Sequence, residues 1–82
     1  MHIRFYKSAL CPRCYFSQKY LLEIAEEHPD LRVEIIDVAS APRRSWSDGI
    51  RMIPALKIDE DVLSGLLLGR AEIADFISRH TT

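Results

Sequence analysis

The amino-acid sequence predicts an α/β fold with the element order β-α-β-α-β-β-α, a mixed four-stranded sheet and helices on both faces of the sheet. Two observations lead to this prediction. A helix-like run that begins at residue 12 separates the strand-like runs 3–6 and 31–38, and such a crossover implies a parallel pair. An acidic turn at residues 59–61 separates two further strand-like runs, which implies an antiparallel pair.

The first strand is predicted over residues 1–6, where apolar residues alternate onto one face. Residues 7–10 connect it to a helix that begins at Pro12 and extends to about His28. This helix has two adjacent apolar sides, which suit packing on a sheet. The sides comprise Cys14, Leu21, Ala25 and His28, and next to them Phe16, Tyr20 and Ile24. The Pro29-Asp30 pair is predicted to end the helix.

The second strand is predicted over residues 31–38, which are rich in valine and isoleucine. Its nearly continuous apolar character is typical of a parallel strand that is covered on both faces. A short helix is expected to begin around Pro42, and Gly49 is a plausible stop for it. For Trp46, in this short segment, we favour packing onto the sheet over a role in docking a partner with Arg43 and Arg44.

The last three elements are two strands and a helix. The third strand spans residues 53–58 and starts through Pro54, because proline is tolerated at a strand start. The fourth spans residues 62–68, with Ser64-Gly65 as a candidate bulge. The final helix, residues 71–79, follows from apolar or aromatic residues at helical spacing. These are Ile73, Phe76, Ile77 and His80.

Composition excludes several classes of protein. The chain has 82 residues, which we assign to one domain (1–82), and 48% of them are hydrophobic, enough to form a core without structural disulfides. The net charge of −1 and the lack of a basic stripe argue against nucleic acid as a partner. No run is long enough to span a membrane, and the N-terminus lacks the apolar region of a signal peptide. We therefore expect a cytoplasmic monomer, although a mature exported chain would have the same features.

The two cysteines, Cys11 and Cys14, are the candidate catalytic residues. Their spacing across the predicted start of the first helix lets them share a disulfide. Cys11 lies at the helix mouth, where free N–H groups and the helix dipole favour a thiolate, whereas Cys14 lies one turn further and should face the core. We therefore predict that Cys11 is the nucleophile and Cys14 the resolving thiol. Pro12 suits the first helical turn. Two interpretations stay open for Arg13, a positive charge beside the Cys11 sulfur or a side chain that points to solvent.

With these elements assigned, the chain resembles the thioredoxin/glutaredoxin superfamily over nearly its whole length. The motif Cys11-Pro12-Arg13-Cys14 is similar to the glutaredoxin and small-thioredoxin pattern. The run Gly49-Ile50-Arg51 followed by Ile53-Pro54 is similar to the second half of thioredoxin. The resemblance implies a thioredoxin-like fold and a cis peptide bond before Pro54. It also implies that Ile53 and Pro54 contact an extended substrate segment, and that this proline lies against the cysteines.

Several departures from the family pattern define the subclass. Leu10 replaces the thioredoxin tryptophan, and the first strand lacks the buried aspartate. Ser8 occupies the position of the glutaredoxin lysine that meets glutathione, with Lys7 one residue further away. The glycine–acid element of glutaredoxins is not reproduced at residues 64–66. The chain is therefore most similar to small, glutaredoxin-sized proteins with thioredoxin-type chemistry.

The expected function is that of an enzyme, a protein disulfide reductase. It would exchange a Cys11–Cys14 disulfide with protein disulfides, bind no cofactor and be recycled by a reductase of the thioredoxin-reductase type or another reductase. A glutathione-dependent glutaredoxin and a non-catalytic peptide-binding adaptor remain as alternatives. Zinc binding is disfavoured, because no histidine stands at ligand spacing from the cysteines and no second CxxC is present.

Overall fold

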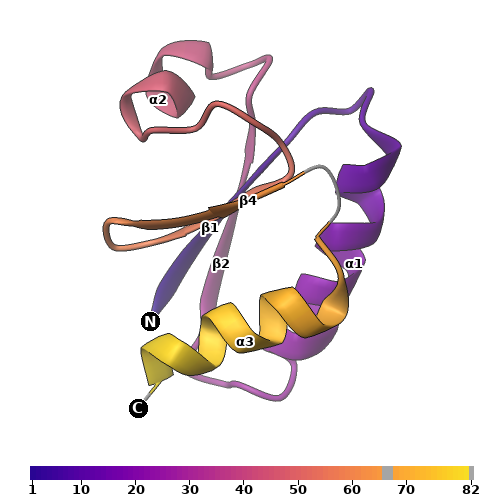
Figure 1. The fold of residues 1–82 in the computed structure, drawn as a ribbon, viewed down its shortest axis with the longest axis vertical. Helices are drawn as coiled ribbons and strands as arrows, with labels where there is room; N and C mark the ends of the chain where they lie inside the picture. The colour runs from indigo at the N-terminus through magenta and orange to yellow at the C-terminus, as the bar shows by residue number, and fades with distance from the viewer. Residues whose placement is uncertain (66–67, 82) are drawn as a thin grey trace.

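The computed structural model describes residues 1–65 and 68–81, for residue 81 the backbone only. The elements along the chain are β1 (His2–Lys7), α1 (Pro12–Ala25), β2 (Arg32–Asp37), α2 (Pro42–Ser47), β3 (Ala55–Ile58), β4 (Asp61–Ser64) and α3 (Arg70–Thr81). The described strands form one four-stranded sheet in the order β2-β1-β3-β4 (Figure 1). β1 pairs in parallel with β2 and antiparallel with β3, and β3 pairs antiparallel with β4. The predicted element order and mixed sheet are confirmed.

The alternation of β1 divides the core into two parts. Ile3 and Phe5 are fully buried in the larger cluster, which includes apolar side chains of α1 and α3. Tyr6 points to the other face and is buried with Ile36 and residues that follow α2. Because successive strand residues point to opposite faces, one strand supplies both clusters.

The helix α1 ends earlier than predicted. The predicted end was near His28, but α1 stops at Ala25, and the next residues form a tighter turn. In that turn the N–H groups of Glu27 and His28 donate to the carbonyl oxygens of Ile24 and Ala25. A proline disfavours helical geometry in the residue before it, so Pro29 explains why the helix does not continue through His28.

The sheet differs from the prediction at its edges. β2 is an edge strand. The predicted coverage on both of its faces is wrong, because Ile35 is 39% exposed. β3 starts after Pro54, not at residue 53. β4 ends at Ser64, whereas the prediction continued to residue 68, and residues 66–67 lie outside the described part of the chain. The acidic turn was predicted correctly, and Asp59 adopts φ +53°, which aspartate tolerates better than most residues.

The segment after α2 leads back to β3. α2 is followed by Gly49 at φ +86°, a left-handed conformation that glycine adopts without steric cost, so the predicted stop is confirmed. Residues 49–54 then run to the start of β3.

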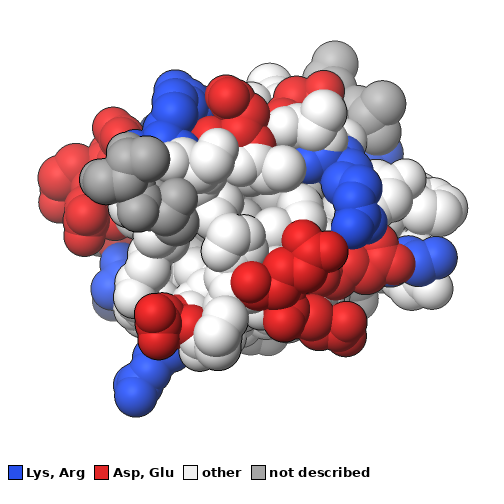
Figure 2. Space-filling model, turned by 90° about the horizontal axis from the view of Figure 1, so that it is seen from below, with Lys and Arg blue, Asp and Glu red and all other residues white. Residues whose placement is uncertain are grey.

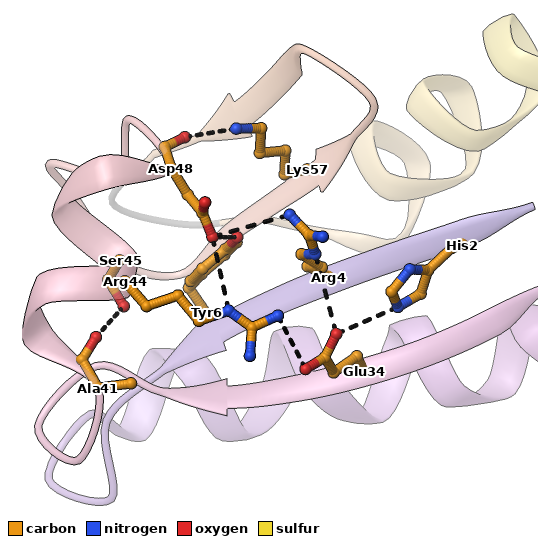
Figure 3. A network of polar contacts seen from close by, with 9 residues as sticks. All are labelled: His2, Arg4, Tyr6, Glu34, Ala41, Arg44, Ser45, Asp48 and Lys57. Carbon is orange, nitrogen blue, oxygen red and sulfur yellow. Dashed lines mark hydrogen bonds and ion pairs between the residues drawn. The ribbon is translucent and has the colours of Figure 1, made fainter.

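A polar network connects α2 to the sheet on the face opposite α1 and α3 (Figure 3). The Tyr6 hydroxyl donates to Asp48 Oδ2 at 2.6 Å, and Lys57 Nζ donates to the Asp48 carbonyl oxygen at 2.8 Å. Arg44 Nη2 lies 3.0 Å from Glu34 Oε2, and Arg44 Nε lies 3.9 Å from Asp48 Oδ2. Residues of β1, β3 and α2 therefore fix the position of Asp48, directly before the 49–54 segment, and β2 contributes only through the contact of Glu34 with Arg44.

Candidate active site

Cys11 is the N-cap of α1. The connection from β1 turns at Ser8, whose carbonyl oxygen accepts the Cys11 N–H at 3.1 Å and whose Oγ accepts the Leu10 N–H at 3.3 Å. Cys11 has extended backbone angles, φ −108° and ψ 101°, and Pro12 follows in the first helical turn. The chain therefore enters α1 with the Cys11 side chain in the place of an ordinary capping group.

The two cysteine side chains are in contact but differ in exposure. Cys14 is buried, with 1% of its surface exposed, whereas Cys11 is half-buried. The Cys14 N–H donates to Cys11 Sγ at 3.2 Å, and the two sulfur atoms lie 2.6 Å apart as free thiols. Both groups of Cys14 therefore stabilise negative charge on the Cys11 sulfur.

These contacts shift the two thiol pKa values in opposite directions. Burial acts to raise the pKa of Cys11, but hydrogen bonds from the Cys14 thiol and N–H outweigh it, and the charge of Arg13 adds to the lowering. Burial, followed by the hydrogen bond to Cys11, raises the pKa of Cys14 to about 11. The pair therefore combines a thiolate-prone sulfur with a protonated one.

A 240 Å³ pocket opens beside the cysteines. Its wall includes both cysteines, Lys7 and two residues of α1 that the sequence analysis did not single out, Tyr15 and Gln18. They follow Cys11 and Cys14 by four positions each, and this helical spacing was the signal that could have identified them.

Ile53 and Pro54 lie at the same end of the sheet as the cysteines. Tyr6 of β1 pairs with Ala55 of β3 in antiparallel register. Pro54 directly precedes Ala55, so it lies at the end of β1 from which the chain continues to Cys11. The Ile53–Pro54 peptide bond is cis. Pro54 is buried, while half-buried Ile53 packs against both core clusters.

The other predicted residues differ in their placement. Pro12 and Arg13 are exposed in the first turn of α1. The preferred prediction for Trp46 was wrong, because the residue is 64% exposed instead of packed on the sheet. Ser45 is the buried residue of α2, and the Arg51 guanidinium covers the Trp46 ring at 3.4 Å from its centroid.

Ser17 is a further residue that the sequence analysis did not identify. It is fully buried, and its hydroxyl donates to the Leu68 carbonyl oxygen at 2.8 Å. This bond joins the middle of α1 to the segment before α3. A serine that follows Cys14 by three residues and precedes Leu21 by four lies on the core side of the helix, which was the available signal.

Two classes of site find no support in the described part of the chain. No group of three or more histidine, cysteine, aspartate or glutamate side chains there could hold a metal ion. None of the helices among residues 1–65 and 68–81 is long and apolar enough to cross a membrane.

Comparisons with known proteins identify relatives. No model of a known protein family matches the chain. The chain is 34% identical to a thioredoxin from Methanocaldococcus jannaschii over 61 residues, which is 73% of this chain and 72% of the relative. This identity and coverage are sufficient to assign a common family.

Solved structures agree on the fold. Thioredoxin 1 from Thermosipho africanus superposes with a TM-score of 0.82 at 22% identity and covers 98% of this chain and 93% of its own. Thioredoxin O2 from Arabidopsis thaliana gives a TM-score of 0.84 at 12% identity, over 99% of this chain and 75% of its own. Thioredoxins of this kind need no cofactor beyond their redox-active cysteines. The chain has a thioredoxin-like fold and belongs to the thioredoxin family of thiol–disulfide oxidoreductases.

Proposed function

We propose that the protein is a protein disulfide reductase in which Cys11 is the attacking nucleophile and Cys14 the resolving thiol. The observation that carries this assignment is the donation of both the N–H and the thiol of Cys14 to Cys11 Sγ. A thiolate attacks a disulfide and a thiol does not, so the sulfur that receives these bonds is the one prepared for the first step.

The cycle balances without a bound cofactor. The Cys11 thiolate attacks one sulfur of a target disulfide, and the other target sulfur leaves as a thiolate that takes a proton from water. Cys14 then gives its proton to water and attacks the Cys11 sulfur of the mixed disulfide, and the second target sulfur leaves as a thiolate that takes up a proton. The reduced target leaves, and the protein retains both oxidising equivalents as a Cys11–Cys14 disulfide. A reductase then returns two electrons to that disulfide.

The substrate segment is proposed to bind along Ile53 and Pro54. An extended peptide can pair with a free backbone edge by strand addition, and a proline at that edge has no N–H that would compete for the sulfur. The pairing of Tyr6 with Ala55 brings Pro54 to the end of β1 that leads to Cys11, which supports this proposed position of the substrate. Pro12 would then stabilise the first turn of α1, and Arg13 would favour the Cys11 thiolate.

Thioredoxin-type turnover is favoured over glutathione-dependent turnover. Glutathione carries carboxylates that proteins usually hold through charge-assisted bonds. At the position of the glutaredoxin lysine this chain has Ser8, a neutral residue whose Oγ accepts the Leu10 N–H. The Methanocaldococcus jannaschii relative is a thioredoxin, which also favours protein disulfides as substrates and a reductase of the thioredoxin-reductase type as partner.

Two matched serine variants test the assignment. Cys14→Ser should react once and accumulate mixed disulfides with insulin through Cys11, because the resolving attack is lost. Cys11→Ser should neither reduce insulin nor form adducts, although it differs from the first variant only in the position of the hydroxyl. Insulin precipitation with dithiothreitol and mass spectrometry of adducts measure both outcomes. Insulin-reducing activity in Cys11→Ser would contradict the mechanism, whereas a lack of insulin-reducing activity in the wild-type protein would leave the adaptor alternative.

A further inference from the structure

An apolar groove lies between α2 and the segment that leads to Pro54. It encloses about 280 Å³, and its apolar lining comprises Val38, Pro42, Trp46, Ile50, Met52 and Ile53. Two of these side chains are large and well exposed, since Trp46 is 64% and Met52 43% accessible. Neither belongs to the two core clusters, so both present apolar surface to the solvent.

The Trp46 ring is held in place although it is exposed. The Arg51 guanidinium lies 3.4 Å from the ring centroid, and Arg51 Nη1 donates to the Trp46 carbonyl oxygen at 2.9 Å and to the Ile50 carbonyl oxygen at 3.2 Å. Stacking of this kind stabilises both partners. Because the two side chains are already ordered, binding at the groove loses less conformational entropy than binding to mobile side chains would.

The charges beside the groove are positive and unpaired. Arg43 precedes Trp46 by three positions on α2, so the two side chains are neighbours on the helix surface. None of the ion pairs among the described residues involves Arg43 or Arg51, whereas Arg44 between them in sequence contacts Glu34 and Asp48. The opposite end of the molecule carries both acidic and basic side chains around an uncharged centre (Figure 2).

We propose that this groove binds an acidic segment of the partner protein, with one apolar side chain seated against Trp46 and carboxylates facing Arg43 and Arg51. The inference rests on the proposed function, because it names the chemistry of the proteins whose disulfides Cys11 attacks. Ile53 lines the groove and also precedes Pro54, so the docked segment would continue into the backbone edge proposed for the substrate. Charge complementarity of this kind contributes mainly to association rate and partner choice.

Activated peptides test the proposal directly. Two synthetic peptides of equal length would each carry one leucine and one cysteine protected as a thiopyridyl disulfide, with flanking glutamates in one and lysines in the other. The Cys11 thiolate of the Cys14→Ser protein attacks the peptide sulfur, the bond to the pyridyl sulfur breaks, and the released thiopyridone is followed by its absorbance. The acidic peptide should react about five- to tenfold faster at low ionic strength. The ratio should fall below about twofold at about 1 M salt, where the screening length is about 3 Å.

The variants separate the groove from the thiol. Replacing Arg43 and Arg51 together by glutamine should remove the preference for the acidic peptide. Arg32→Gln is the matched control, since Arg32 is exposed, has no ion pair among the described residues and starts β2. Trp46→Ala should lower the reaction rate of the leucine peptide several-fold more than the rate of the same peptide with glycine in place of leucine. Each rate is divided by the same protein's rate with uncharged dithiodipyridine, so that changes in thiol reactivity cancel.

The possible results are distinct. Failure to react with dithiodipyridine would overturn the proposed function and this inference with it. Normal reaction with dithiodipyridine but equal rates for the two peptides would overturn the docking proposal alone. The same would follow if Arg32→Gln reduced the preference as much as the double variant did.

Discussion

Tyr6→Phe tests the contact that holds α2 against the sheet. Tyr6 is fully buried and donates its only hydroxyl hydrogen to Asp48 Oδ2 at 2.6 Å. A hydrogen bond to a charged group contributes about 1.5–3 kcal/mol to stability. The remaining neighbours of Asp48 Oδ2, Arg4 and Arg44, are 3.8 and 3.9 Å away and do not replace this bond. We expect the variant to lose about 1.5–3 kcal/mol of unfolding free energy and roughly 8–16 °C in Tm.

The same contact predicts a pH dependence with a defined sign. Burial, followed by the hydrogen bond to Asp48, raises the pKa of Tyr6 from 10.0 to about 12. A group whose pKa is higher in the folded state gives stability that is complete below its unfolded pKa and is lost as pH rises towards its folded pKa. The shift of two units corresponds to about 2.7 kcal/mol. The stability difference between wild type and Tyr6→Phe should therefore be constant below pH 10 and shrink between pH 10 and about 12.

Urea unfolding of both proteins across this pH range measures the difference. Every other titrating group is shared by the two proteins, so the subtraction isolates Tyr6. Tyr20→Phe is the control, because its hydroxyl has no hydrogen-bond partner among the described residues, and it should stay within about 0.5 kcal/mol of wild type. The reasoning is refuted if Tyr6→Phe is equally close to wild type, or if the difference between them stays constant up to pH 12.

Three further outcomes are expected. Brief iodoacetamide treatment should label Cys11 far faster than Cys14, because the pKa of Cys11 is lowered and that of Cys14 is about 11, and equal labelling in peptide mass spectra would contradict the assignment of roles. NADPH consumption should be faster with a thioredoxin-reductase-type enzyme than with glutathione and glutathione reductase, and saturable glutathione turnover would place the protein with glutaredoxins. Gly49→Ala should cost about 1–2 kcal/mol in urea unfolding through its φ of +86° alone, since the added Cβ meets no atom within 4 Å, and a neutral substitution would show that the loop can adopt another backbone geometry.

The cysteine site was predictable from sequence because its geometry is local. A helix start fixes where Cys11 and Cys14 lie relative to free N–H groups, and only two residues of chain separate the two cysteines. The strand order was harder to predict from the sequence. The crossover from β1 implied a parallel neighbour, but nothing in residues 31–38 indicated that this neighbour would be an edge strand with Ile35 exposed.

Trp46 and Asp48 show why the rest of the structure could not be predicted. A helix of six residues, such as α2, is too short for its apolar spacing to decide which side faces the sheet, and small Ser45 occupies that side while Trp46 faces outward. Tyr6 and Asp48 are 42 positions apart, and neither residue type signals a partner at such a distance. Contacts of this kind depend on the assembled sheet and not on a local pattern.

In the proposed site, local contacts determine the reactivity of the thiol pair, whereas long-range contacts position the surface that is proposed to bind partners. The groups that lower the pKa of Cys11 belong to residues 13 and 14, within the first turn of α1. The groove is lined mainly by residues of α2 and of the segment between α2 and β3, which includes Ile53. Bonds from Tyr6 and Lys57 to Asp48 fix the start of that segment. Substitutions around Trp46 can therefore change which partners dock without altering the thiol pair, and substitutions in the first turn of α1 can change thiol reactivity without altering the groove.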